Sequence, residues 1–190
     1  EQVFNRFGLK TLWIDFTKSN FEEVISNHKP AMIWIESPTN PLLKIIDIKG
    51  ICHFSNKMQI PVVVDNTFAT PLLQKPLKLG ATLSLTSTTK YINGHSDALG
   101  GAVCTESTVW RDKLNFAQKA LGLNPSPFDC WLITRGIKTL PLRLERQISN
   151  ASKIANQLAD NPAIKSVRYP FRSDHPQCKL AQRQMAKGGA

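Results

Sequence analysis

The sequence predicts an α/β protein in which a mainly parallel sheet is covered by helices. Short, almost continuously apolar stretches alternate with stretches that have helical periodicity and helix-capping residues, and this alternation is typical of parallel strands buried on both faces. Hydrophobic residues make up 42% and charged residues 20% of the 190 positions. That balance excludes wholesale disorder and suits one domain, or one domain and part of a second.

The first half of the chain is predicted to contain most of the strands. The apolar stretches form them, and the helices between them begin at residues that can cap a helix, such as Asn20 and Asp47. Pro38 and Pro41 require a loop. In chain order we expect a strand at 10–15, a helix at 20–28, a strand at 31–36, a loop at 37–41, a helix at 47–58, a strand at 61–65, a short helix that ends at Gly80, and strands at 81–86 and 101–105.

The second half is predicted to be mainly helical. The helical pattern starts near residue 109, and the longest helix is expected at 140–159, where apolar residues recur every three or four positions along one face. Pro162 ends this helix, and a short strand is expected at 164–169. Asp174 is expected to cap a last helix.

The charge balance and the scattered cysteine and histidine residues limit the class of partner. Lys and Arg number 24 against 14 Asp and Glu, so the net charge is +10, which favours an anionic partner without choosing one. The basic residues form no run, so we expect a solvated basic surface rather than a nucleic-acid partner.

No apolar run approaches the roughly 18 residues of a membrane span, and no signal peptide is visible. The four cysteines and four histidines lack metal or disulfide spacing, so we expect no metal, no membrane and a cytoplasmic location.

Polar side chains follow three neighbouring predicted strands. Asn40 comes after the second strand, Asp65 ends the third, and Lys90 follows the fourth. Ligands of open parallel sheets bind outside the carboxyl ends of the strands, so we expect an amide, a carboxylate and an amine on one rim. Hydroxyl groups stand beside them at Thr67 and in the Ser/Thr stretch 87–89.

This set of groups suits pyridoxal phosphate. The ionised Asp65 follows three valines and needs a positive partner, which a protonated ring nitrogen supplies. The hydroxyls before Lys90 suit a phosphate group, and the cofactor needs a lysine for its Schiff base.

Each of these residues also has a purely structural explanation. Asp65 can form a cap or a turn, a loop lysine such as Lys90 is usually solvated, and Asn40 between two prolines can be a turn residue. The stretch 95–97 contains the letters of a hydrolase triad, but residues adjacent in sequence do not normally converge as a triad requires. The joint placement of three groups on successive strand ends favours function.

Three stretches carry a family resemblance: IESPTNP at 35–41, VVVDNTFATP at 62–71 and STTKYINGHSD at 87–97. They resemble the Cys/Met-metabolism family of pyridoxal phosphate enzymes, which includes cystathionine γ-synthase, γ-lyase and β-lyase and methionine γ-lyase. The later stretches PFD at 127–129 and RGIKTL at 135–140 also resemble this family, whereas YPFR at 169–172 departs from its usual Tyr-Pro-Gly-Leu.

The resemblance implies a role for six residues. Lys90 is implied to be the Schiff-base lysine and Asp65 the partner of the pyridine nitrogen, and these two are the implied catalytic residues. The other implied cofactor contacts are Ser87 and Thr89 to the phosphate, Asn40 near the ring and the substrate carboxylate, and Thr67 facing the ring region.

The implied fold is the large domain of the aspartate-aminotransferase type, followed by a small C-terminal domain. We expect the large, cofactor-binding domain at 1–139, incomplete at its N-terminus, and a linking helix with the beginning of the second domain at 140–190. The family implies a homotetramer, built as a dimer of dimers, with active sites shared between two chains.

The implied reaction is β/γ-elimination or γ-replacement on cystathionine or an O-acylhomoserine, within transsulfuration and methionine or cysteine metabolism. A cystathionine lyase or γ-synthase is expected, and methionine γ-lyase and sulfhydrylase activities remain alternatives. Family members are longer than this chain, and their additional parts supply a glycine-containing phosphate turn and the arginine that grips the substrate carboxylate. A truncated module that cannot complete the site is therefore a further alternative.

Overall fold

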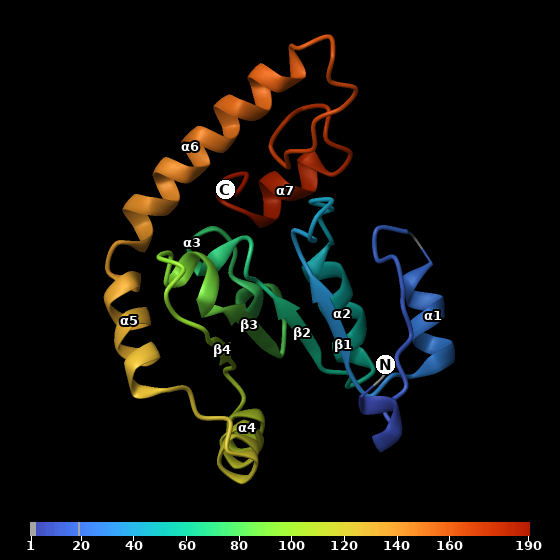
Figure 1. Ribbon diagram of the computed structural model, residues 1–190. Helices are drawn as coiled ribbons and strands as arrows, with labels where there is room; N and C mark the ends of the chain where they lie inside the picture. The colour runs from blue at the N-terminus through green and yellow to red at the C-terminus, as the bar shows by residue number, and fades with distance from the viewer. Residues whose placement is uncertain (1–2, 19) are drawn as a thin grey trace.

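A four-stranded sheet forms the centre of the chain, and its strands lie side by side in sequence order (Figure 1). The computed structural model describes residues 3–18 and 20–190. β1 pairs with β2 and β2 with β3 in parallel, whereas β4 runs antiparallel to β3. The prediction of a mainly parallel sheet is confirmed. The strands are β1 (Ile33–Glu36), β2 (Val62–Asp65), β3 (Leu83–Ser87) and β4 (Gly101–Cys104).

The remaining elements follow the predicted order closely. The longest helix, α6, has the bounds expected from its apolar periodicity. Asp47 caps α2 as predicted, since its Oδ1 accepts a hydrogen bond from the Gly50 N–H at 2.9 Å. The helices are α1 (Phe21–His28), α2 (Ile48–Lys57), α3 (Thr70–Leu73), α4 (Thr108–Leu121), α5 (Pro127–Ile137), α6 (Leu140–Ala159) and α7 (Cys178–Gln184), and the short turns are η1 (Phe4–Phe7), η2 (Pro76–Leu79) and the π-turn η3 (Thr88–Ile92).

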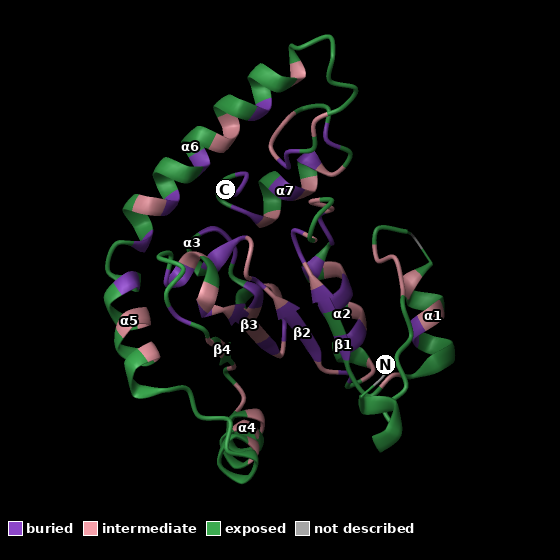
Figure 2. Cartoon of the chain, viewed as in Figure 1, coloured by how far each residue is buried: buried purple, intermediate pink, exposed green. Residues whose placement is uncertain are grey.

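Two apolar clusters pack around the sheet. In the first, α1 and α2 cover β1 and β2, with Ile51 of α2 packed among residues that include Val62 and Val64. In the second, α6 and α7 pack on the segment around α3 and η3, where Leu144 and Ala181 are buried together. Figure 2 shows this buried centre in purple, whereas α4 is mostly green because none of its residues is fully buried.

The sheet is mainly but not wholly parallel, because β4 runs antiparallel to β3. Parallel neighbours need a long crossover, usually through a helix, but the chain between β3 and β4 contains only η3 and an irregular loop. The chain therefore doubles back beside β3. β4 is also largely exposed, in contrast to the buried β2.

Two predicted strands and one predicted cap are wrong. Residues 10–15 and 164–169 form no ladder with the sheet, and a strand requires a hydrogen-bonded neighbour. Trp13 is 80% exposed, so its apolar segment does not lie in the core. The residue at the cap position of α7 is Gln177, and the Asp174 carboxylate, which lies before it, pairs with the Arg172 guanidinium at 3.0 Å.

In the part of the chain that the structure describes, no helix combines the length and apolar character that crossing a membrane requires.

Candidate functional site

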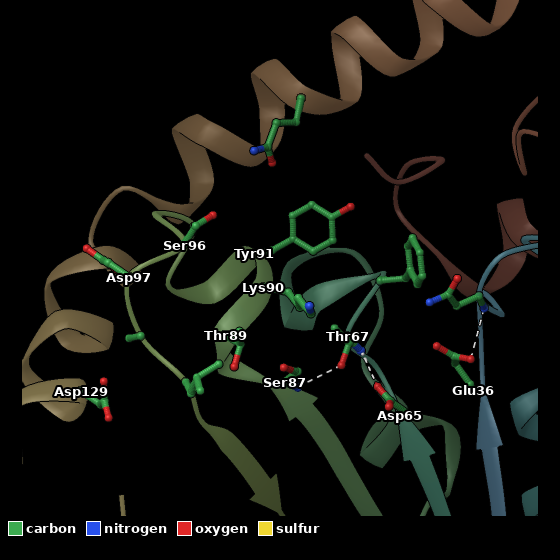
Figure 3. A pocket seen from close by; sticks show the side chains of 16 residues that line it. Glu36, Asp65, Thr67, Ser87, Thr89, Lys90, Tyr91, Ser96, Asp97 and Asp129 are labelled. Carbon is green, nitrogen blue, oxygen red and sulfur yellow. Dashed lines mark hydrogen bonds between the residues drawn. The ribbon is translucent and has the colours of Figure 1, made fainter. Parts of the chain in front are cut away.

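A cleft of about 1000 Å³ opens at the carboxyl ends of β1, β2 and β3 (Figure 3). The residues that end these strands, Glu36, Asp65 and Ser87, all line it. The structure thus brings together the whole set of site residues predicted from the sequence. The six that line the cleft are Asn40, Asp65, Thr67, Ser87, Thr89 and Lys90.

β2 carries Asp65 to the rim of the cleft. The three valines before it are buried and hold the strand in the sheet. The Asp65 Oδ1 atom accepts a hydrogen bond from the Thr67 N–H at 2.9 Å, and the Thr67 Oγ1 atom accepts one from the Ser87 N–H at 2.9 Å. This chain of bonds links the ends of β2 and β3 and orients the carboxylate. Among the described residues, no donor bonds to the second carboxylate oxygen, so it can accept from a ligand.

The π-turn η3 carries Lys90 directly after β3. The turn is closed by hydrogen bonds from the Asn93 N–H to the Thr88 carbonyl, at 2.9 Å, and from the Gly94 N–H to the Lys90 carbonyl, at 2.7 Å. The backbone of Lys90 itself is non-helical, with φ −88° and ψ −120°. Its ammonium group lines the cleft and has no hydrogen-bond or ion-pair partner within the described ranges 3–18 and 20–190. The amine is therefore available to a ligand.

The two predicted phosphate contacts differ in how far their hydroxyls are already engaged. The Thr89 Oγ1 atom accepts from the Gly100 N–H at 2.9 Å and donates to the Gly100 carbonyl at 3.3 Å. The second of these bonds is long, so a phosphate oxygen can compete for that proton. The Ser87 hydroxyl has no side-chain hydrogen bond to any described residue.

Glu36 is a cleft residue that the sequence analysis missed. Its Oε2 atom accepts a hydrogen bond from the Asn40 N–H at 3.1 Å, which fixes the loop that follows β1. Burial raises the pKa of the Glu36 carboxyl, and the nearby Asp65 charge raises it further, although the bond from Asn40 acts in the opposite direction. The signal was present in the sequence, because parallel pairing in register sets Glu36 beside Asp65.

Later elements also contribute to the cleft. Asp129 of α5 and Gln147 of α6 line it, and no local pattern connects these helices to the strand ends. Asp97 lines it as well, but its Oδ1 atom accepts a hydrogen bond from Asn93 Nδ2 at 2.8 Å, and His95 Nδ1 lies 2.7 Å from the Asn93 carbonyl oxygen. The triad letters at 95–97 therefore form no triad.

The donor set of the cleft fits pyridoxal phosphate. A carboxylate with a free oxygen suits the protonated ring nitrogen, an amine without a partner suits the aldehyde carbon, and hydroxyls beside that amine suit the phosphate. In this chain Asp65, Lys90, Ser87 and Thr89 supply these groups from two adjacent strand ends.

Comparison with known proteins gives one consistent result. The family model described as Cys/Met metabolism PLP-dependent enzyme matches residues 1–190. The chain is 44% identical over 184 residues to human cystathionine gamma-lyase, which covers 96% of this chain and 45% of the human protein. It is 42% identical over 179 residues to the cystathionine beta-lyase of Coxiella burnetii, with 94% of this chain and 46% of that protein covered.

A solved structure agrees with these sequence relatives. The fold matches the cystathionine gamma synthase of Xanthomonas oryzae pv. oryzae in complex with cystathionine, with a TM-score of 0.95 and 40% identity. The match covers 100% of this chain and 49% of that one. The chain thus spans about half the length of the relatives it matches.

Proposed function

This chain belongs to the family of Cys/Met metabolism PLP-dependent enzymes, and we propose that it carries the cofactor-binding residues of an enzyme of sulfur amino-acid metabolism. The proposed reaction is β/γ-elimination or γ-replacement on cystathionine or an O-acylhomoserine. The observation that carries the proposal is the convergence of Asp65 and Lys90, from two strand ends, on one cleft.

Lys90 and Asp65 have different tasks in this proposal. Pyridoxal phosphate supplies an electron-withdrawing ring that takes up the electron pair released at the substrate Cα. Lys90 would hold the cofactor covalently until the substrate amine replaces the lysine amine there, and the released Lys90 amine would then move protons at the substrate Cα and Cβ as general base and acid. Asp65 keeps the proton on the ring nitrogen, and the Thr67 N–H holds the carboxylate in place for this.

The remaining residues bind and orient. Ser87 and Thr89 hold the phosphate through their hydroxyls, with the positive charge of Lys90 nearby. Asn40 lies near the ring and the substrate carboxylate, and Glu36 keeps its loop in place through the bond to the Asn40 N–H. Thr67 faces the ring region.

Covalent labelling tests the cofactor assignment. Purified protein is mixed with pyridoxal phosphate, reduced with borohydride and mapped by mass spectrometry. With one equivalent of pyridoxal phosphate, the cofactor mass is expected predominantly on Lys90, and the exposed Lys119 of α4 serves as an internal control for the background of non-specific labelling. An unlabelled Lys90 contradicts the proposal and supports a module without catalysis.

Replacement of the lysine tests its catalytic role. Lys90→Ala removes both the covalent link and the proton-transferring amine, so turnover is expected to fall by at least about 10²–10⁴-fold, the usual contribution of a general acid–base group. The control Lys119→Ala keeps full turnover. Retained elimination activity in the Lys90 variant refutes the assigned role.

The thiol released from cystathionine distinguishes the reactions. β-Cleavage releases homocysteine and γ-cleavage releases cysteine, so one assay with cystathionine separates them. The proton transfers assigned to Lys90 serve both routes, and the relatives named above carry both activities at similar identity.

The assembly, domain division and location are part of the proposal. We propose that the protein is a homotetramer located in the cytoplasm. Residues 1–139 would form the large domain, and residues 140–190 would form the linking helix and the beginning of the C-terminal domain. Exposed aromatic side chains on α4 and α5 support an interface, among them Phe116 and the stacked pair Phe128 and Trp131. The free thiols of Cys52, Cys104, Cys130 and Cys178 suit a reducing compartment. Light scattering of the purified protein tests the assembly, and a monomeric mass contradicts it.

A further inference from the structure

One guanidinium connects the Lys90 turn to the two helices that follow. Arg143, in the first turn of α6, donates to the Tyr91 carbonyl at 2.9 Å and to the Ile92 carbonyl at 3.2 Å. It also donates to the Gly136 carbonyl at 2.8 Å, near the end of α5, and from Nε to Thr139 Oγ1 at 3.0 Å. Three elements thus meet at a single charged group.

Two of the carbonyls that Arg143 binds, those of Tyr91 and Ile92, lie immediately after Lys90. Carbonyls at the end of a helical turn have no partner within the turn and present partial negative charge. A guanidinium satisfies several of them at once with charge-assisted bonds, because its N–H groups form a rigid planar fork. Arg143 is therefore suited to hold the end of η3, and its side chain does not itself line the cleft.

The turn needs such support, because the backbone of Lys90 lies outside the helical region inside a π-turn. Conformations of this kind persist where the surrounding structure determines them, and they occur often at functional sites. The end of the η3 turn packs closely against Arg143 and α5. A Cβ atom at Gly94 would overlap the Arg143 guanidinium, and one at Gly136 would overlap the Asn93 carbonyl.

We infer that Arg143 is a positioning residue that holds the η3 turn against α5 and α6 and thereby sets where the Lys90 amine lies in the cleft. The inference rests on the proposed role of Lys90. Arg143 touches neither cofactor nor substrate and acts through the backbone that carries the lysine.

Two substitutions at this position separate positioning from simple stabilisation. Arg143→Met keeps a side chain of similar length but removes the positive charge and all hydrogen-bond donors. Arg143→Lys keeps the positive charge but loses the planar, forked arrangement of N–H donors. Arg146→Met is the matched control, because Arg146 lies on the same helix, is exposed and makes no hydrogen bond with the described residues. Cofactor-free protein is mixed with a fixed concentration of pyridoxal phosphate. The rate of covalent attachment to Lys90 is followed by absorbance and by borohydride trapping, at a temperature where melting curves show every variant to be folded.

Attachment is expected to slow at least about tenfold in Arg143→Met, since a displacement of about 1 Å in a reacting group can cost about 10²-fold. Arg143→Lys is expected to fall between this variant and the unmodified protein, and Arg146→Met to match the unmodified protein. A folded Arg143→Met protein that melts earlier but attaches the cofactor at the unmodified rate overturns the inference.

If Arg143→Met does not fold, Arg143→Lys decides, and an unmodified attachment rate in that variant overturns the inference. A failure of the proposed function is distinguishable from both results. In that case Lys90 takes up no cofactor even in the unmodified protein, and the role inferred for Arg143 is then refuted together with the role proposed for Lys90.

Discussion

Asp65 and Lys90 acquire their chemical roles from the places where their strands end. The valines before Asp65 are 0–2% exposed. The Asp65 carboxylate therefore lies at the boundary between the buried part of β2 and the open cleft. One of its oxygens accepts from the Thr67 N–H, and the other accepts no hydrogen bond from any residue that the structure describes and can accept from a ligand. Lys90 follows β3 without an intervening helix, so its amine reaches the same space.

Asp65→Asn tests the pairing with the ring nitrogen. The amide keeps the size of the side chain and an oxygen for the Thr67 N–H, but it loses the negative charge. A hydrogen bond to a charged group contributes about 1.5–3 kcal/mol, so pyridoxal phosphate is expected to bind about ten- to a hundredfold more weakly, with a parallel fall in turnover. Asp160→Asn, an exposed carboxylate at the end of α6 outside the cleft, is the control. Unaltered cofactor affinity in Asp65→Asn contradicts the pairing.

Glu36→Gln tests the electrostatic coupling of the two neighbouring carboxyls. Because folding raises the pKa of Glu36, the folded state holds this proton more tightly than the unfolded state. The charged form therefore costs stability at neutral pH, and the cost disappears as the pH falls through the raised pKa. Gln keeps an oxygen for the Asn40 N–H, so the variant is expected to be more stable than the unmodified protein at pH 7 and equal to it near pH 4.

Urea unfolding at the two pH values measures this difference, with Glu106→Gln on the exposed loop before α4 as the control. A gain of the same size at both pH values would show that the effect is not the titration of Glu36.

At the scale of elements, α6 is the clearest case in which local pattern decided structure. Its bounds match the prediction, and its buried residues Leu140, Leu144 and Ile148 recur at helical spacing. By contrast, the segments 10–15 and 164–169 have apolar residues but no neighbouring strand. Propensity alone does not form a strand, because a strand is completed by hydrogen bonds to another segment.

Leu144→Ala tests the contribution of the buried face of α6. The side chain is 2% exposed within the second apolar cluster, so its loss is expected to lower the free energy of unfolding by about 2–5 kcal/mol. Leu142→Ala on the same turn is the control, since Leu142 is 74% exposed and surface changes usually stay within about 0.5 kcal/mol. Equal losses in urea unfolding for the two variants would contradict the assignment of the buried face.

At the scale of the whole molecule, the half-buried amide of Gln184 and the buried amide of Gln74 join segments that lie far apart in the sequence. Gln184 of α7 donates to the Ile46 carbonyl and to Gln74 Oε1, both at 3.0 Å, and accepts from the Ile48 N–H at 3.0 Å. Gln74 in turn donates to the Ser37 carbonyl at 2.7 Å. This network attaches the C-terminal helix to the loop that follows β1, and hence to one wall of the cleft.

Gln184→Ala tests this attachment. The substitution leaves buried donors and acceptors without partners, at a cost of about 1–3 kcal/mol. The melting temperature and the free energy of unfolding are both expected to fall. Gln182→Ala, two positions earlier and exposed, is the control and is expected to change neither. Equal stability of the two variants would show that the network contributes nothing net.

The sequence by itself determined the order of the strands that form the sheet, the capped start of α2, the span of α6 and the six polar residues at the strand ends. These features depend on local chemistry, namely the period of apolar side chains, the hydrogen bonds of a helix start and the identity of the residues that end a strand. Parallel strands then bring successive ends to one edge, which is why the sequence alone groups Asn40, Asp65 and Lys90.

Only the tertiary structure decided the direction of β4 and the connection from Arg143 to the Lys90 turn. Each of these depends on which segments meet in space. Such pairings are set by the packing of the whole chain and leave no periodic or compositional signal in the segments themselves.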